Sequence, residues 1–256
     1  MSTTIYYFSG TGNSLKIAKD LCCLLKDSEV VRITGKLVAQ EIPVHSEKIG
    51  IVFPVFAEGV PLLVENFVRQ INVVPHQTTY VFAISNFGES SGCSLTQLKQ
   101  LLAEKNLILA DTFEIQMPDN FNVFYPPAPE AEQNTMIGIQ EKMMAGIAKI
   151  VNEATFSPTL DDTDTQDSWQ RPEFVPYEID KKFWLNDQCN SCGTCEKVCA
   201  AGNIRIADNT PSWQHHCEFC LACMHWCPNQ AIQFEDKTTQ WGRYQCPTIT
   251  LKDMVV

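Results

Sequence analysis

The C-terminal part of the chain contains one cysteine pattern twice. Cys189, Cys192, Cys195 and Cys199 have the spacing C-x2-C-x2-C-x3-C, and Cys217, Cys220, Cys223 and Cys227 repeat it, with Pro228 directly after the last. Intervals of three residues let successive sulfur atoms point toward one centre, which is how a short segment holds an iron–sulfur cluster. The repeated pattern therefore predicts two [4Fe–4S] clusters, and their eight ligands constrain how this segment can fold.

The fourth cysteine of each run is expected to bind the other cluster, as is usual for this spacing. Cluster one is accordingly assigned Cys189, Cys192, Cys195 and Cys227, and cluster two Cys217, Cys220, Cys223 and Cys199. Zinc sites usually carry two separated C-x2-C pairs. Disulfides need an oxidising compartment. Both alternatives fit the pattern less well than clusters do.

This segment resembles the bacterial-type two-cluster ferredoxins. The two runs start at Cys189 and Cys217, which are 28 residues apart, and residues 203–206 after the first run match residues 230–234 after the second. The match indicates an internal duplication. We expect a small pseudo-symmetric α+β unit of β-hairpins and helices wrapped around its clusters.

The composition limits the partners and the compartment. The chain has 256 residues, enough for two domains, and a formal net charge of -11. Such an acidic protein is expected to repel nucleic acid and anionic membranes, and to favour a redox partner protein with basic patches. Twelve cysteines without an apparent secretion signal or membrane-spanning run indicate metal binding in a reducing, cytoplasmic setting.

The N-terminus predicts an anion-binding loop. A β-rich run, 3–8, is followed by Ser9, Gly10, Thr11, Gly12, Asn13 and Ser14, and then by a helical pattern with an apolar face. Glycines let backbone N–H groups approach a phosphate, and the start of a helix adds a favourable dipole. Leu15 stands where a dinucleotide fingerprint or a Walker loop would require glycine, so both nucleotide interpretations fail.

The loop resembles the phosphate loop of flavodoxins, which bind FMN. That resemblance implies an α/β fold with a doubly wound parallel five-stranded sheet in the order 2-1-3-4-5. It also implies that two later loops flank the flavin ring. They follow predicted strands at 48–53 and 79–84 and precede helices at about 62–70 and 94–105. Their candidate FMN-binding residues are Pro54, Val55, Phe56, Gly59, Ser85, Asn86, Phe87 and Gly88.

The role of the two phenylalanines stays open. Phe56 and Phe87 can pack against the flavin ring or simply anchor their loops. A fifth strand is predicted at 108–116, and a final helix at about 132–153. The intervening run Met117–Phe121 resembles a segment of flavodoxin–ferredoxin fusions and is expected to cover the flavin or to form a substrate pocket. Tyr125 is either a proton donor there or a structural residue.

The complete order is a flavodoxin-like FMN domain (1–155), an acidic linker (156–176) and a two-cluster ferredoxin domain with a short tail (177–256). It resembles the bacterial and archaeal flavodoxin–ferredoxin fusion family (EFR1 type). FMN accepts electrons singly or in pairs, and each cluster carries one, so this combination implies an oxidoreductase that couples a ferredoxin-type partner to two-electron chemistry. The sequence offers no evident acid–base pair. An electron carrier or a redox sensor without catalysis is the alternative.

Overall fold

A five-stranded parallel sheet organises the N-terminal part of the chain. The computed structural model describes residues 2–73, 80–155 and 176–255. The sheet has the order β2-β1-β4-β6-β7, with β1 (Thr3–Tyr7), β2 (Ser28–Arg32), β4 (Lys48–Pro54), β6 (Tyr80–Phe87) and β7 (Leu109–Gln116). Numbered along the chain, this is the predicted order 2-1-3-4-5, so the flavodoxin-like fold class is confirmed. The sequence analysis had not located β2.

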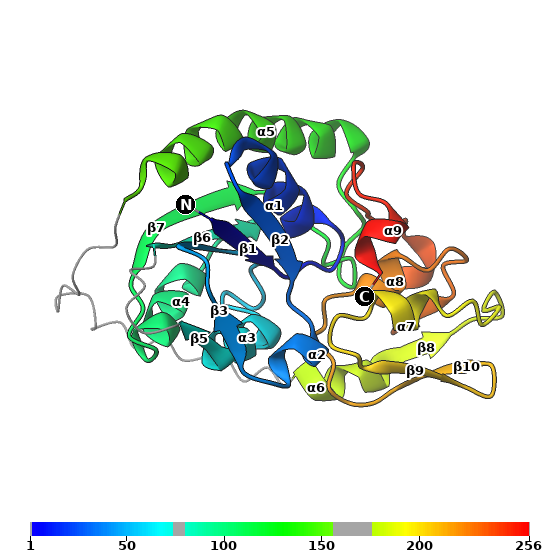
Figure 1. Cartoon of the computed structure of the whole chain (residues 1–256). Coiled ribbons are helices and arrows are strands. Elements are labelled where there is room, and N and C mark those ends of the chain that lie inside the picture. The colour runs from blue at the N-terminus through cyan, green and yellow to red at the C-terminus, as the bar shows by residue number, and fades with distance from the viewer. Residues whose placement is uncertain (1, 74–79, 156–175, 256) are drawn as a thin grey trace.

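Helices cover both faces of the sheet (Figure 1). One face is covered by α1 (Asn13–Leu24) and α5 (Glu130–Glu153), and the other by α3 (Leu62–Gln70) and α4 (Ser94–Ala103). The central strands are buried on both faces, and β4 is buried at every residue. Continuous apolar strands between two helical layers are typical of a doubly wound sheet, because each face needs a cover.

A short accessory region was not anticipated from the sequence. It consists of α2 (Gly35–Val38), β3 (Ile42–Val44) and β5 (Ile71–Val73). The two strands form a separate parallel pair. Each has only three residues, so neither run is long enough to produce a readable periodicity.

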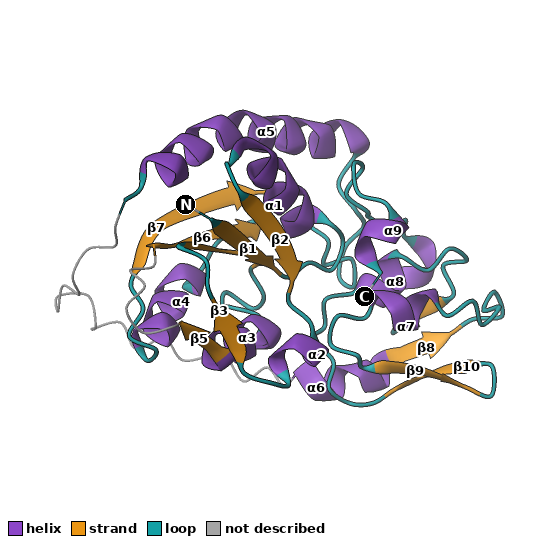
Figure 2. Cartoon of the chain, viewed as in Figure 1, coloured by secondary structure: helices purple, strands orange, loops and turns teal. Residues whose placement is uncertain are grey.

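The cysteine-rich part is built from two antiparallel strand pairs and short helices (Figure 2). Its elements are α6 (Pro176–Ile179), the 3₁₀ helix η2 (Asp180–Lys182), β8 (Phe183–Leu185), α7 (Thr194–Val198), β9 (Ile204–Ala207), β10 (Thr210–Trp213), α8 (Ala222–His225), β11 (Ile232–Phe234), the 3₁₀ helix η3 (Thr238–Gln240) and α9 (Leu251–Met254). The pair β9–β10 is a hairpin, whereas β11 returns to pair with β8. Each cysteine run thus contributes one helix, and the pair β8–β11 joins the strand before the first run to the strand after the second.

The cysteine-rich part packs on the carboxyl end of the sheet. Val198, Trp226 and Ile249 join the core cluster that includes α1 and α5. Ala200 belongs to the cluster on the opposite face of the sheet. Hydrogen bonds also cross the contact, from Gly35 N to Ala200 O at 2.7 Å. The two parts therefore share their hydrophobic cores.

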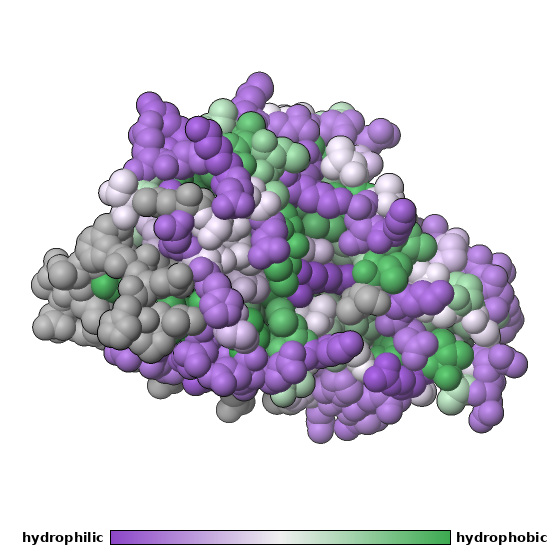
Figure 3. Space-filling view, viewed as in Figure 1, coloured by the Kyte–Doolittle hydropathy of each residue, from purple (hydrophilic) through white to green (hydrophobic). Residues whose placement is uncertain are grey.

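The surface of the protein is largely polar on the face that Figure 3 shows, with smaller hydrophobic patches. No helix within the described ranges is long and apolar enough to cross a bilayer. The acidic linker predicted at 156–176 lies outside the described residues, except for Pro176 at the start of α6.

Candidate functional site

A pocket of about 570 Å³ lies where the sheet meets the cysteine-rich part. Its sheet side is formed by the last residues of β4 and β6, by the segments that follow β4, β6 and β7, and by Asn13 at the start of α1. Its other side is formed by residues of η2, β11 and the loop before α8. Carboxyl ends of parallel strands are where ligands bind in open α/β sheets. Here a second structural unit closes over that edge.

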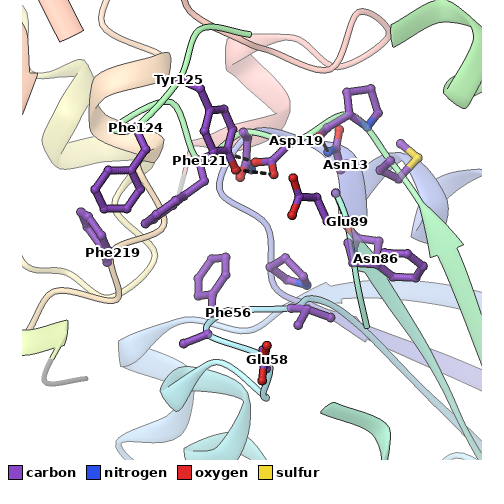
Figure 4. Close-up of a pocket in the computed structure, with 18 of the residues that line it drawn as sticks. Asn13, Phe56, Glu58, Asn86, Glu89, Asp119, Phe121, Phe124, Tyr125 and Phe219 are labelled. Carbon is purple, nitrogen blue, oxygen red and sulfur yellow. Dashed lines mark hydrogen bonds between the residues drawn. The ribbon is translucent and has the colours of Figure 1, made fainter. Parts of the chain in front are cut away.

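Part of the predicted FMN site lines this pocket. The lining residues among the candidates are Asn13, Pro54, Val55, Phe56, Asn86, Phe87 and Gly88. The remaining candidates, Ser9, Gly10, Thr11, Gly12, Ser14, Gly59 and Ser85, are not among the lining residues. Figure 4 shows that Asn13, Asn86 and Phe56 come from different segments around one cavity. The candidates for contact with the flavin ring thus mostly line the pocket, whereas the phosphate loop lines it only through Asn13.

The phosphate loop is buried and held by neighbouring side chains. Thr11 Oγ1 accepts a hydrogen bond from Asn120 Nδ2 at 2.6 Å, and Ser14 Oγ accepts one from Asn86 Nδ2 at 2.7 Å. A hydroxyl has one proton to donate in addition to its acceptor sites. Both hydroxyl protons therefore remain for an oxygen-rich ligand.

The start of α1 offers further donors. The first backbone N–H groups of a helix have no partner within it, and no side chain of the described structure caps this helix at Gly12. Gly12 has φ +106°, a left-handed conformation that favours glycine. Uncapped N–H groups and free hydroxyl protons suit a phosphate, so the donor set fits FMN.

Two loop glycines are also contact points for the C-terminal part. A Cβ at Gly10 would stand 2.2 Å from the backbone oxygen of Cys220. One at Gly12 would stand 3.0 Å from Cys246 and Ile249. Cys246 N also donates to Thr11 O at 2.9 Å. These glycines therefore admit the other part of the molecule, and Cys246, to which the sequence analysis gave no role, is buried in the contact.

Carboxylates dominate the charge of the pocket. The lining contains Glu58, Glu89, Asp119, Glu218 and Glu235, and one cation, Lys182, which pairs with Glu235 at 2.7 Å. Tyr125 donates to Asp119 at 2.7 Å, as Figure 4 shows. Burial, followed by this hydrogen bond and the charges of Asp119 and Glu89, raises the pKa of Tyr125. Tyr125 consequently stays protonated and orients Asp119.

An aromatic wall connects the pocket to the cysteines. Phe219 lies between Cys217 and Cys220 in sequence, lines the pocket, and is 5 % exposed. Its ring contacts Phe121 edge-to-face, with centroids 5.2 Å apart. Its backbone N–H donates to Cys217 Sγ at 3.2 Å. The same residue therefore touches a predicted cluster ligand and the pocket.

The cysteines assigned to cluster one surround a small cavity. Cys189, Cys192, Cys195 and Cys227 all line it, together with residues of β9, β10 and β11. Three ligands come from the first run and the fourth from the second run. The exchanged ligand assignment stays a prediction, and the structure brings these four cysteines to one cavity.

The four cysteines assigned to cluster two lie close enough to influence one another. Burial, together with the charges of Cys217, Cys220, Cys199 and Cys195, raises the pKa of Cys223 far above its usual value. Burial also raises the pKa of Cys220 to about 12. Buried thiols crowded together ionise only when positive charge compensates them, which iron supplies. This donor set fits a cluster.

Among the described residues, no three Cys, His, Asp or Glu side chains converge closely enough to hold a single metal ion. A tetrahedral zinc site requires four ligand atoms about 2.0–2.3 Å from one ion. In a cubane each thiolate binds a different iron atom, so the sulfur atoms lie farther apart.

Several pocket residues were missed from the sequence because they come from the other part of the chain. They are Ile179, Lys182, Glu218, Phe219, Phe234 and Glu235. Phe219 alone carried a usable signal, since a residue between two cluster ligands lies beside whatever exchanges electrons with that cluster. The others depend on how the two parts dock.

Comparisons with known proteins give partial likenesses. No family model matches the chain. Over 53 residues it is 43% identical to an uncharacterized polyferredoxin-like protein of Methanocaldococcus jannaschii, a stretch that is 21% of this chain. The match spans only 23% of that relative.

Solved structures resemble the chain over about half its length. A flavodoxin of Megasphaera elsdenii is 22% identical and has a TM-score of 0.38, covering 57% of this chain and 98% of the flavodoxin. A Lactobacillus acidophilus flavoprotein in complex with FMN is 13% identical with a TM-score of 0.37, covering 44% and 92%. A Bacillus anthracis azoreductase is 11% identical with a TM-score of 0.39, covering 60% and 100%.

Proposed function

We propose that this chain is a flavo-iron–sulfur oxidoreductase that passes electrons between two [4Fe–4S] clusters and FMN. The observation that carries the proposal is the shared pocket. The flavin-type loops form one side of it, and Phe219, between two predicted cluster ligands, forms part of the other. Electron transfer needs its cofactors close together, and the proposal is supported by Phe219, which lines the pocket and donates its backbone N–H to Cys217.

Bound FMN would supply both one-electron and two-electron chemistry, and each cluster would supply single electrons. Thr11, Ser14 and the first N–H groups of α1 would hold the phosphate. Asn86 and the backbone near Val55 would border the ring, with Phe56 and Phe121 excluding water. Tyr125 and Asp119 hold a proton between them at the pocket wall.

The contacts of Phe219 support an order of sites for the electrons. Phe219 lines the pocket and donates its backbone N–H to Cys217, an assigned ligand of cluster two, so we place cluster two between the flavin and cluster one. We propose that a one-electron partner with a basic surface docks on the acidic chain and reduces cluster one first. The pocket carboxylates favour a neutral or cationic substrate at the flavin over an anionic one.

Two domains are proposed, 1–155 for FMN and 177–256 for the clusters, joined by the acidic segment 156–176. This is the arrangement of the flavodoxin–ferredoxin fusion family that the sequence resembles. A carrier or a redox sensor would contain the same cofactors. A carrier needs a flavin edge that is open to its partner, whereas here residues of the cysteine-rich part cover one side of the pocket, which favours the oxidoreductase.

The decisive experiment measures cofactor content. The chain purified under anaerobic conditions is expected to contain about eight iron atoms, about eight sulfides and about one FMN. Turnover with reduced ferredoxin and candidate acceptors then separates an oxidoreductase from a carrier. Iron without flavin would refute the FMN part of the proposal, and flavin without iron would refute the cluster part.

Filling the pocket is expected to remove the flavin. Val55→Trp places a large ring inside the cavity that Val55 lines, and we expect FMN content to fall at least tenfold while iron stays near eight atoms. Ile139→Trp is the matched control, because Ile139 is 53% exposed and lies on α5, outside the pocket. Normal FMN content in the Val55 variant would place the flavin elsewhere.

A further inference from the structure

Two arginines from different parts of the chain approach the two groups of cysteines. Arg32 ends β2, in the sheet. Its guanidinium crosses to the cysteine-rich part, where Nη2 donates to Val198 O at 3.1 Å and Nη1 donates to Met254 O. Val198 directly precedes Cys199, an assigned ligand of cluster two. The sheet thus contributes a positive charge beside cluster two.

Arg243 has the corresponding place near cluster one. It belongs to the segment after η3, and its Nη2 donates to Ile232 O at 3.2 Å and to Gln233 Oε1 at 3.0 Å. Ile232 lines the small cavity that contains the four cysteines assigned to cluster one. Nη1 donates to Thr238 O and Trp241 O at 3.0 and 2.9 Å. The guanidinium is therefore fixed by backbone and amide oxygens.

Both arginines keep one buried donor without a partner. Nε of Arg32 and Nε of Arg243 are buried and have no hydrogen-bond partner within the described structure. A buried N–H group without an acceptor is costly, so natural proteins rarely leave one unexplained. Among the described residues, Nε lacks an acceptor in both arginines, and each arginine lies beside a different group of cysteines. This points to an acceptor in cluster two for Arg32 and an acceptor in cluster one for Arg243.

The charges around the two guanidinium groups agree with this placement. Burial lowers the pKa of Arg32, while the charges of Tyr7, Cys220 and Cys199 raise it. Burial likewise lowers the pKa of Arg243, and Cys227 raises it. The cysteines that act on Arg32 are thus assigned ligands of cluster two, and the cysteine that acts on Arg243 is an assigned ligand of cluster one.

We infer that Arg32 and Arg243 are the counter-charges of the two clusters, Arg32 for cluster two and Arg243 for cluster one, and that each raises the reduction potential of its cluster. The inference rests on the proposed function. Reduction adds one electron to a cluster, so the cubane with its four thiolates becomes more negative by one charge. A fixed positive charge nearby stabilises the reduced form more than the oxidised form.

Because Arg32 belongs to the sheet, the potential of cluster two depends on the docking of the two parts. An electron is therefore held most favourably at cluster two when the flavin pocket is assembled. Separation of the parts removes Arg32 and makes cluster two harder to reduce. Fewer electrons therefore enter cluster two when the flavin is out of reach.

The test is a redox titration of the whole chain with dithionite, followed by electron paramagnetic resonance. Arg32→Gln is expected to lower the reduction equilibrium constant of cluster two at least tenfold, about 59 mV for one electron, and to change cluster one less than threefold. Arg243→Gln is expected to do the reverse. Cys192→Ser is expected to lose cluster one, so the paramagnetic resonance signal that remains in this variant identifies cluster two. Arg205→Gln is the control, because Arg205 is 63% exposed and faces Glu196.

Arg32→Lys keeps the positive charge and loses the planar guanidinium group. We therefore expect the reduction equilibrium constant of cluster two to change less than threefold and the fold to stay intact. A tenfold loss in the lysine variant, unchanged potentials in both glutamine variants, or equal shifts of both clusters would each overturn the inference. Failure of the proposed function has a different signature. In that case the unmodified chain itself contains no iron after anaerobic purification.

Discussion

Cys192→Ser is expected to lower the iron content from about eight atoms per chain to about four, and to halve the sulfide. Cys192 lines the cavity shared with Cys189, Cys195 and Cys227. The hydrogen bond with Thr194 is the largest cause that lowers the pKa of Cys192, which favours the thiolate that binds iron. Removing this thiolate leaves cluster one with three ligands.

The flavin is expected to stay bound in this variant, because Cys192 does not line the large pocket. Cys23→Ser serves as the control, since Cys23 is an exposed cysteine of α1 outside both runs. Iron, sulfide and extracted FMN measured on the three proteins decide the outcome. Full iron in Cys192→Ser would show that this cysteine is not a ligand.

Gly10→Ala is expected to weaken the docking of the two parts. A Cβ at this position would stand 2.2 Å from the backbone oxygen of Cys220, and a backbone atom cannot turn aside as a side chain can. Trp226 Nε1 also donates to Gly10 O at 3.0 Å, so moving the cysteine-rich part away from Gly10 breaks this hydrogen bond too. Overpacking of a tight contact costs about 1–3 kcal/mol. We expect a loss of unfolding free energy of that size.

Two measurements check this prediction. Urea unfolding reports the stability, and rapid mixing reports the rate at which reduced clusters pass electrons to the flavin, which should fall. Gly146→Ala is the control, because a Cβ at Gly146 on α5 meets nothing within 4 Å. Alanine there should stabilise the helix by about 0.5–1 kcal/mol. A Gly10→Ala protein with normal stability and normal transfer would contradict the observed contact.

Local patterns accounted for much of the fold. The strands β1, β4 and β7 were predicted to within one residue at each end. The prediction for β6 ended at residue 84, but the strand continues to Phe87, so Ser85, Asn86 and Phe87 belong to the strand and not to the loop after it. Buried parallel strands read as short apolar runs, and the polar Ser85 and Asn86 interrupt such a run. The strand β2 was not located from the sequence. Its five residues, Ser28–Arg32, are partly exposed and include charged side chains, so they lack such a run.

The two cofactor regions differ in how far local sequence could describe them. Cluster ligands recur at fixed short spacings, so the pairing of Cys227 with Cys189 could be proposed before its place around one cavity was known. The pocket is different, because Phe219 and Lys182 reach it only by long-range packing. Spacing along the chain contains no information about such contacts.

By itself, the sequence determined the doubly wound sheet, the two cysteine runs and the glycine-rich loop, since each depends on neighbours along the chain. Only the tertiary structure decided that the cysteine-rich part closes the carboxyl edge of the sheet. It alone brought Gly10 against Cys220 and carried Arg32 across to Val198. Docking of this kind depends on shape and on buried donors that meet acceptors far away in sequence, and these properties exist only once both parts have folded.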